Sequence, residues 1–300
     1  MLDALDSRHD SDKPLFTCAW DRVLMIHYEV DPALLQPAIP FPLDCFDDRA
    51  YVSLVAFTIR GMRLNVGGPF TAWLTAPIAT HEFLNVRTYI RRGNEAGIYF
   101  MAEWLPNRLS VLLGPRVFGL PYRLGGLEYD HNHQEGSLRG TITADDGAGV
   151  LRYIAQIPEV AVYSTPDRGS LTEFLMERYA AFTQSNDRQS MFRVWHDPWQ
   201  QTAATVSVQN EGLLELSGRW NEEAELVCAN YCPGLTDVGM GWPIRLRNRT
   251  HEGQRVMRTK TGMCRPFRAS DFIGHRYPGR CPGLTSVGPS GQKTLASKRK

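Results

Sequence analysis

Residues 84–104 read LNVRTYIRRGNEAGIYFMAEW, and this stretch decides the fold class. Its two ends, 84–90 and 97–104, are rich in β-branched and aromatic side chains, which favour strands. The segment between them, RRGNEAG, has the glycine and asparagine that are typical of a turn. The stretch therefore predicts a β-hairpin.

Similar apolar runs recur along most of the chain. Strands are predicted where these runs lie between turn residues, at 22–30, 50–64, 137–145, 150–158 and 203–209. Many short strands with only a few helices predict a mainly β fold of the α+β class, either a barrel or a sandwich.

Three helices are predicted from their caps. Asp31 followed by Pro32 begins a short helix that Pro37 ends, and Asn107 caps a helix over 108–118 that ends near Gly119. The third prediction covers residues 169–184, where Ser170 and Glu173 have the spacing of a capping box. An apolar stripe continues this third helix, through Leu171, Phe174, Leu175, Tyr179 and Phe182.

The charge of the chain is distributed unevenly. Residues 1–244 carry 19 Lys and Arg against 30 Asp and Glu, whereas residues 245–300 carry 14 against 2. We therefore expect an acidic body that carries a basic C-terminal extension. The extension has too few apolar residues from about 282 onward to fold, so disorder is expected there.

The beginning of the chain lacks the basic and apolar regions of an export signal, and no apolar run is long enough for a membrane span. We therefore expect a cytoplasmic protein without a membrane partner. Six cysteines in 300 residues are then expected to be reduced thiols.

Six blocks of sequence, in order, resemble a known family: FLNVRTYI, GIYFMAEW, FGLPYRLG, FLMERYAAFT, HDPW and NYCPGLTDV. These look like the signature blocks of the YqjF-like bacterial family, known as domain of unknown function 2071, over roughly residues 15–247. The resemblance therefore implies a tail at 1–14, a folded domain at 15–247 and the basic C-terminal extension at 248–300. That family is similar to acetoacetate decarboxylase. The resemblance implies a closed β-barrel with a few flanking helices.

The chain departs from the decarboxylase pattern at the reactive residue. The decarboxylases carry Gly-x-Pro-Lys-Lys, in which the first lysine forms a Schiff base, and the matching residues here are Gly119 to Arg123. Tyr122 stands at the lysine position, and a phenol cannot form an imine. Upstream, Glu29 follows Tyr28 where the decarboxylases have an arginine. The resemblance therefore implies the position of a site without its imine chemistry.

Polar residues near these blocks are the candidate site. Arg87 and Tyr89 are two apart in a strand and share a face. If that face is interior, Arg87 needs a carboxylate, either that of Glu82 or Glu103 or that of an anionic ligand. Tyr122 and Arg123 are either a ligand-facing phenol and cation or a rim tyrosine with a solvated arginine.

The segment VWHDPWQ places His196 between Trp195 and Trp199. His196 is either an acid–base group or a structural histidine in an aromatic turn. His27, after four apolar residues, is favoured as a core histidine. The complete candidate site has Tyr122 and His196 as catalytic residues, and as ligand-binding residues Arg87, Tyr89, Arg123, Glu103 and Trp199.

Other chemistries have weaker signals. Cys228 and Cys232 have downstream cysteines and histidines, at Cys264, Cys281, His251 and His275, but lack a second closely spaced pair, so no metal site is expected. No nucleotide-binding motif occurs, and no cofactor is expected. Residues 245–268 are basic with one aromatic residue, Phe267, which disfavours nucleic-acid binding.

Three functions remain open from the sequence. The first is a barrel that binds a small organic acid, or a related apolar ligand, in its interior. The second is an enzyme that uses Tyr122, Arg87 and His196 in acid–base chemistry on a small carbonyl or carboxylate substrate. The third is an interaction protein that acts through the basic C-terminal arm. The oligomeric state does not follow from the sequence.

Overall fold

The computed structural model describes residues 13–66, 75–246 and 265–266. In this part of the chain the fold is mainly β with few helices, as predicted. The strands are β1 (Phe16–Val30), β2 (Asp44–Cys45), β3 (Ala50–Leu64), β4 (His81–Arg92), β5 (Glu95–Leu105), β6 (Tyr122–Asn132), β7 (Ser137–Ala144), β8 (Val150–Gln156), β9 (Ala180–Ser185), β10 (Arg188–Trp195), β11 (Thr202–Asn210), β12 (Glu225–Met240), β13 (Ile244–Arg245) and β14 (Arg265–Pro266). The α-helices are α1 (Pro32–Leu35), α3 (Arg108–Val117) and α4 (Leu171–Met176), and the 3-10 helices are η1 (Gln36–Ala38), η3 (Ala76–Ile78), η4 (Leu214–Ser217) and η5 (Arg219–Glu223).

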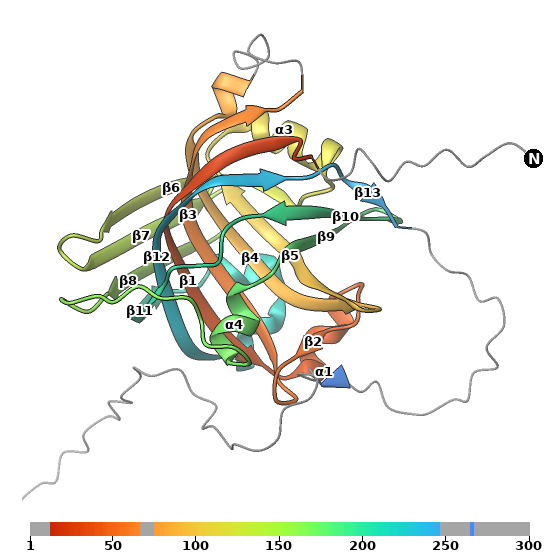
Figure 1. Ribbon diagram of the computed structural model, residues 1–300. Coiled ribbons are helices and arrows are strands. Elements are labelled where there is room, and N and C mark those ends of the chain that lie inside the picture. Colours follow the sequence, from red (N-terminus) through yellow and green to blue (C-terminus); the bar gives the residue numbers. More distant parts are fainter. Residues whose placement is uncertain (1–12, 67–74, 247–264, 267–300) are drawn as a thin grey trace, which may run out of the picture.

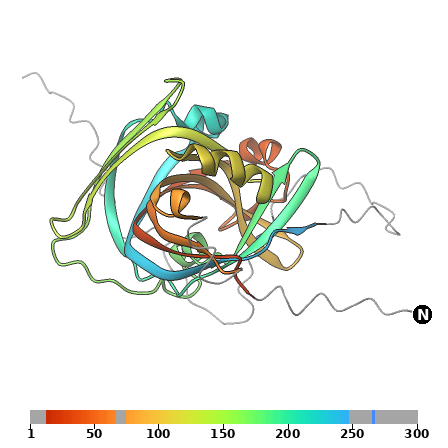
Figure 2. The same ribbon diagram turned by 90° about the horizontal axis from the view of Figure 1, so that it is seen from above.

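Twelve strands form one sheet in the order β13-β10-β9-β5-β4-β3-β1-β12-β11-β8-β7-β6. Two further pairings, β10 with β12 and β5 with β6, return the sheet onto itself twice. The pairing of β5 with β6 forms a ring of nine strands. The ring formed by β10 and β12 shares five of these strands, namely β5, β4, β3, β1 and β12. Seen from above in Figure 2, the strands curve around a common centre.

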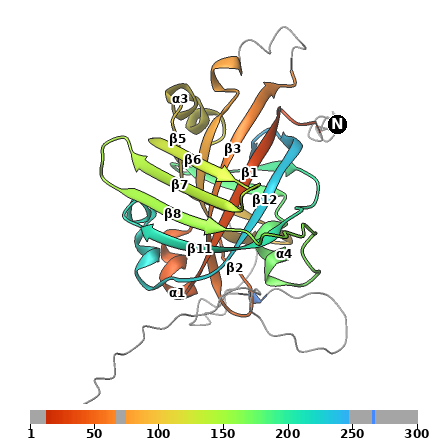
Figure 3. The same ribbon diagram turned by 90° about the vertical axis from the view of Figure 1, so that its left-hand side faces the viewer.

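The shared strands bury both of their faces. Along β1, Val23 and Met25 belong to one apolar cluster, whereas Leu24 and Ile26 belong to another. The second cluster continues into β7 and β8, and the first continues into β10 and contacts α3 and α4. In Figures 1 and 3, α3 lies near one end of the strands and α4 toward the other.

The hairpin predicted at 84–104 forms as β4 and β5, and the strands predicted at 22–30, 50–64, 137–145, 150–158 and 203–209 are also present. Two predicted helix caps are confirmed as well. The Asp31 side chain accepts from the backbone N–H of Ala33, and the Asn107 side chain accepts from that of Ser110. These signals are local, so the sequence is sufficient to specify them.

The helix predicted over 169–184 is wrong beyond Met176. Ser170 caps it as expected, but α4 has only six residues, and Phe182 lies in β9. β9 pairs with β10 over 180–185 and with β5 at Ala181 and Phe182. Strand pairing, with the adjacent β10 and the distant β5, therefore outweighs the helical periodicity of this segment.

The expected C-terminal extension lies outside the described residues, apart from 265–266. The expected N-terminal tail is described from residue 13 onward. No helix in the described ranges has the length and apolar character needed to cross a membrane.

Candidate functional site

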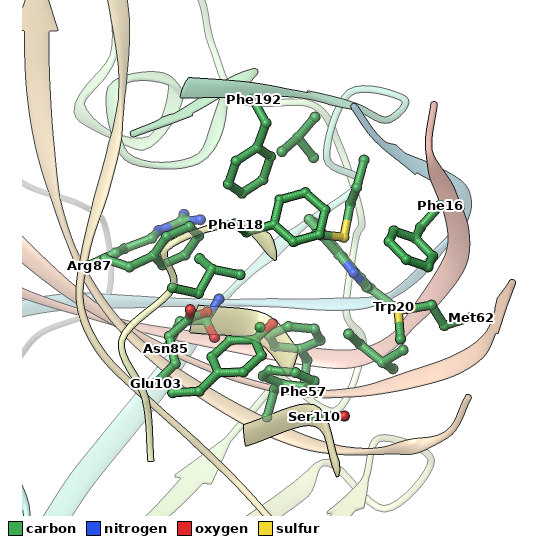
Figure 4. Close-up of a pocket in the computed structure, with 18 of the residues that line it drawn as sticks. Phe16, Trp20, Phe57, Met62, Asn85, Arg87, Glu103, Ser110, Phe118 and Phe192 are labelled. Carbon is green, nitrogen blue, oxygen red and sulfur yellow. The ribbon is translucent and has the colours of Figure 1, made fainter. Parts of the chain in front are cut away.

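A cavity of about 160 Å³ lies against the face of β3, β4 and β5 that carries the first apolar cluster. On the other sides it is enclosed by β10, by Met240 at the end of β12, by α3 and by the segment after α4. Figure 4 shows its aromatic lining, which includes Phe16, Trp20, Phe57, Phe118 and Phe192. Most of the lining is therefore apolar, and the few polar side chains are easy to single out.

Five of the seven predicted site residues line this cavity, namely Arg87, Glu103, Tyr122, His196 and Trp199. Tyr89 and Arg123 do not. The lining also includes polar residues that were not predicted, namely His81, Asn85, Ser110 and Arg178.

Arg87 enters the cavity from β4 and is 6% exposed. Its Nη2 donates to the carbonyl oxygen of Leu175 at 3.2 Å and approaches the sulfur of Met25 at 3.6 Å. Its Nε is buried without a hydrogen-bond partner among the described residues. No carboxylate of the described residues forms an ion pair with it, so neither Glu82 nor Glu103 is the protein partner considered from the sequence.

Tyr89 lies behind Arg87 on the same face and is fully buried. Its hydroxyl donates to the same carbonyl oxygen, of Leu175, at 2.8 Å, and lies 2.6 Å from the Ser53 hydroxyl. Ser53 continues this chain to Nδ1 of His27 at 2.6 Å. Burial, and then the charge of Arg87, lower the pKa of His27 to about 3, so His27 is neutral. Tyr89 and His27 therefore belong to a buried chain of hydrogen bonds beneath Arg87, which links β1, β3 and β4 to α4.

Arg178 is the second cation in the lining. Its Nη1 donates to Asp44 at 2.9 Å, and its Nε donates to the carbonyl oxygen of Phe174. Asp44 is fully buried and also pairs with Arg91 at 2.9 Å. The Asp44 carboxylate thus forms ion pairs with both Arg91 and Arg178.

Three polar residues of adjacent strands lie in one row. Asn85 of β4 is opposite Glu103 of β5, and Glu103 is opposite Tyr122 of β6. Glu103 is 3% exposed, and its Oε2 has no hydrogen-bond partner among the described residues. Burial raises the pKa of Glu103 well above the ordinary value of a glutamate.

A β-bulge brings Glu103 into the cavity. The pairing of β4 with β5 shifts between Val86 and Arg87, so that Val86 is opposite Ala102 but Arg87 is opposite Phe100. The extra residue, Met101, lets both Phe100 and Glu103 line the same cavity although they are three residues apart.

Tyr122 begins β6, and its ring packs edge-on against Phe83 with a centroid distance of 5.7 Å. Burial, followed by the nearby Glu103, raises the pKa of Tyr122 well above that of a free phenol. The next residue, Arg123, points to the opposite side of the strand, where its guanidinium lies 5.4 Å from the Trp104 ring centroid. Arg123 is exposed and does not join the cavity group.

His196 and Trp199 form an aromatic wall with Trp20. Nδ1 of His196 lies 2.7 Å from the carbonyl oxygen of Asp197, so it is the backbone of Asp197, not its carboxylate, that contacts the ring. His196 stacks on Tyr179 at 4.7 Å, and Trp199 stacks on Trp20 at 5.8 Å. Burial lowers the pKa of His196, which favours the neutral imidazole.

Buried polar atoms without partners gather at the cavity. Of the thirteen such side-chain atoms in the described residues, nine belong to the lining. They are Trp20 Nε1, both ring nitrogens of His81, Asn85 Oδ1, Arg87 Nε, Glu103 Oε2, Ser110 Oγ, Arg178 Nη2 and Trp199 Nε1. Because buried polar groups normally have partners, this concentration marks the cavity as the candidate binding site.

Alternation along β4 could have identified two of the residues that sequence reasoning missed. Arg87 and Tyr89 were placed on one face, and the same period of two extends back to Asn85, Phe83 and His81. Burial lowers the pKa of His81 to about 4. No comparable signal exists for Ser110 or Arg178, whose positions depend on how α3 and α4 pack.

No group of three metal-ligating side chains occurs in the described part of the chain. Cys228 and Cys232 are both buried in β12. Cys264, Cys281, His251 and His275 lie outside the described residues.

Comparison with known sequences yields one family. The model of DUF2071, described as an uncharacterized conserved protein, matches residues 17–236. The uncharacterized protein YqjF of Bacillus subtilis is 26% identical over 193 residues, which cover 63% of this chain and 76% of that protein.

Comparison with solved structures finds the acetoacetate decarboxylase fold. An acetoacetate decarboxylase-like enzyme from Sphingomonas wittichii has a TM-score of 0.53 and 18% identity, over 82% of this chain and 98% of its own. Acetoacetate decarboxylase from Legionella pneumophila has a TM-score of 0.54 and 12% identity, over 83% and 99%. The enduracididine biosynthesis enzyme MppR, complexed with pyruvate, has a TM-score of 0.54 and 11% identity, over 79% and 92%.

Proposed function

The chain belongs to the DUF2071 family, and from this membership and the cavity we propose that it binds a small, largely apolar organic acid inside a closed, acetoacetate decarboxylase-like β-barrel, without Schiff-base chemistry. The two closing strand pairs, β10 with β12 and β5 with β6, support the barrel. The pyruvate complex of MppR, a protein of similar fold, supports a small carboxylate as the kind of ligand.

Arg87 carries the proposal. A guanidinium removed from water is strongly destabilising unless an anion or several acceptors compensate it. Its Nη2 has the Leu175 carbonyl oxygen, but its Nε has no partner in the described chain. A ligand carboxylate that accepts from this guanidinium would supply the missing charge, and the aromatic lining would bury the rest of the ligand.

The lysines support the exclusion of imine chemistry. Lys13 is the one lysine in the described residues, and it is exposed, whereas Lys260, Lys293, Lys298 and Lys300 lie outside them. Tyr122, at the position of the Schiff-base lysine, lines the cavity with its phenol. A desolvated amine, which imine formation needs, is therefore not provided by the cavity lining.

Binding of 4-ethylbenzoate, measured by calorimetry, tests the proposal. Arg87→Met should weaken binding about 10- to 150-fold, which corresponds to the loss of a charge-assisted hydrogen bond of roughly 1.5 to 3 kcal/mol. Arg87→Lys keeps the charge and should retain more affinity than Arg87→Met.

Tyr89→Phe is the matched control. It removes the other donor to the Leu175 carbonyl oxygen but leaves the charge in the cavity unchanged. Its affinity for 4-ethylbenzoate should stay close to that of the wild type. Equal losses in Tyr89→Phe and Arg87→Met would assign Arg87 to the support of α4 and contradict the proposal, as would a wild type that binds no carboxylate.

A further inference from the structure

Two parts of the polar lining of the cavity differ in charge. Arg87 is a cation, whereas the row of Asn85, Glu103 and Tyr122 contains no cation. Adjacent strands lie about 4.7 to 4.9 Å apart, and β5 lies between β4 and β6, so Glu103 stands between Asn85 and Tyr122 and can share a ligand oxygen with either of them. Figure 4 shows Asn85 and Glu103 reaching into the cavity from the same wall.

Two of the three residues have polar atoms without protein partners. Asn85 Oδ1 and Glu103 Oε2 are both buried and make no hydrogen bond to a described residue. Both side chains are more than nine-tenths buried, and both line the cavity. The Asn85 amide supplies donors and an acceptor, and the Tyr122 phenol supplies a donor, so the row can satisfy an oxygen that carries no charge.

We propose that Asn85, Glu103 and Tyr122 form a second subsite, which binds an uncharged hydroxyl or carbonyl oxygen of the ligand while Glu103 is present as the protonated acid. This assignment rests on the proposed function, because Arg87 must hold the carboxylate of the same ligand. The ligand class is therefore an apolar acid with one additional uncharged oxygen, rather than a plain hydrocarbon acid.

The surroundings of Glu103 favour its protonated form. An ionised carboxylate there would need a cation, and Glu103 has no ion pair within the described chain. The titratable groups that line the same cavity are Arg87 and His81 of β4, Tyr122 of β6, and Arg178 and His196 beyond α4. Burial keeps His81 and His196 neutral near pH 7, and Arg178 is paired with Asp44. Burial also raises the pKa of Glu103 itself.

The spacing along β4 sets the length of the ligand. Asn85 and Arg87 are two residues apart in the strand, so their Cα atoms lie about 6 to 7 Å apart. A benzoate with a hydroxymethyl group in the para position has its carboxylate and hydroxyl at comparable distance. 4-(Hydroxymethyl)benzoate and 4-ethylbenzoate have nearly the same shape and differ by a hydroxyl in place of a methyl group, so they form a matched pair of probes.

Binding of the two probes at pH 7 tests the subsite. An apolar pocket alone would prefer 4-ethylbenzoate, because burying a hydroxyl without a partner is unfavourable. The subsite instead predicts that the wild type binds 4-(hydroxymethyl)benzoate at least about tenfold more tightly. Tyr122→Phe should reduce this preference, whereas Glu103→Gln, which keeps a donor and an acceptor, should largely retain it. Glu103→Leu should abolish it.

Infrared spectroscopy tests the protonation of Glu103 independently of any ligand. The wild type at pH 7 should show the carbonyl stretch of a protonated carboxyl group, and Glu103→Gln should lack it. Absence of this band in the wild type would overturn the assignment of a neutral Glu103.

The outcomes separate the subsite from the proposed function. If both probes bind through Arg87 but 4-ethylbenzoate binds as tightly as the hydroxyl analogue, the subsite is refuted and the proposed function stands. If neither probe binds, both fail.

Discussion

We expect Gly114→Ala to destabilise the protein, although alanine is the better helix former. Gly114 lies in α3, and a Cβ at this position would lie 2.2 Å from Cε2 and 2.3 Å from Cδ2 of the Tyr122 ring. Ordinary contacts between such carbon atoms are near 3.5 to 4.0 Å, so the ring or the helix must move by more than about 1 Å. Overpacking of this kind costs about 1 to 3 kcal/mol, whereas replacing a helical glycine by alanine contributes about 0.5 to 1 kcal/mol of stability.

The net effect should be a free energy of unfolding lower by up to about 2.5 kcal/mol, measured by urea denaturation. The cause is testable in a double-mutant cycle. In a Tyr122→Ala background the ring is absent, so Gly114→Ala should become neutral or stabilising. Gly126→Ala in β6, where a Cβ would meet nothing within 4 Å, is the control for a glycine replacement near the same strand. A Gly114→Ala protein more stable than the wild type, or additive effects in the cycle, would refute the reasoning.

Two further predictions concern buried titratable groups. Asp44→Asn should lower the free energy of unfolding by about 3 to 5 kcal/mol in urea denaturation, because it leaves Arg178 without its carboxylate, whereas Glu222→Gln, in an exposed pair, should leave it almost unchanged. Burial lowers the pKa of His27 to about 3 and that of His131 to about 4, so the folded state takes up fewer protons than the unfolded state below pH 6.5. Stability should therefore fall as the pH drops from about 6.5 toward 4, by up to about 1.4 kcal/mol per pH unit for each histidine. Urea denaturation at pH 7, 6 and 5 measures this slope, and His131→Gln should reduce it; an unchanged slope in that variant would contradict the prediction.

The features of the fold that the sequence could predict are those determined within about ten residues. The β4–β5 hairpin has its turn between two alternating strands, and the side chains of Asp31 and Asn107 cap helices by accepting from backbone N–H groups two or three residues away. The prediction of a helix over 169–184 failed beyond Met176 because the conformation of residues 180–185 depends on their pairing with β5 and β10. Periodicity carries no information about such partners.

The candidate site could be predicted in part for the same reason. Alternation placed Arg87 and Tyr89 on one face without deciding whether that face is interior, and the family resemblance drew attention to Tyr122; Arg87 and Tyr122 both line the cavity. Alternation also proposed Tyr89 as a ligand-binding residue, but its hydroxyl contacts Leu175 and Ser53 and does not reach the cavity. Whether a residue on the correct face touches the cavity depends on its depth along the strand, and the sequence does not specify depth.

The bulge at Met101 explains why Arg87 and Glu103 line one cavity without forming an ion pair. Strict alternation from Ile98 and Phe100, which belong to the first cluster, would direct Glu103 to the face of the second cluster. The bulge reverses the direction after Phe100, so Glu103 returns to the cavity, but opposite Asn85 and not opposite Arg87. A register shifted by two residues would have placed Glu103 opposite Arg87, where the two side chains could form an ion pair. The observed register keeps a cation and an uncharged acid apart on one wall, at a cost in stability that a bound ligand with two polar ends would offset.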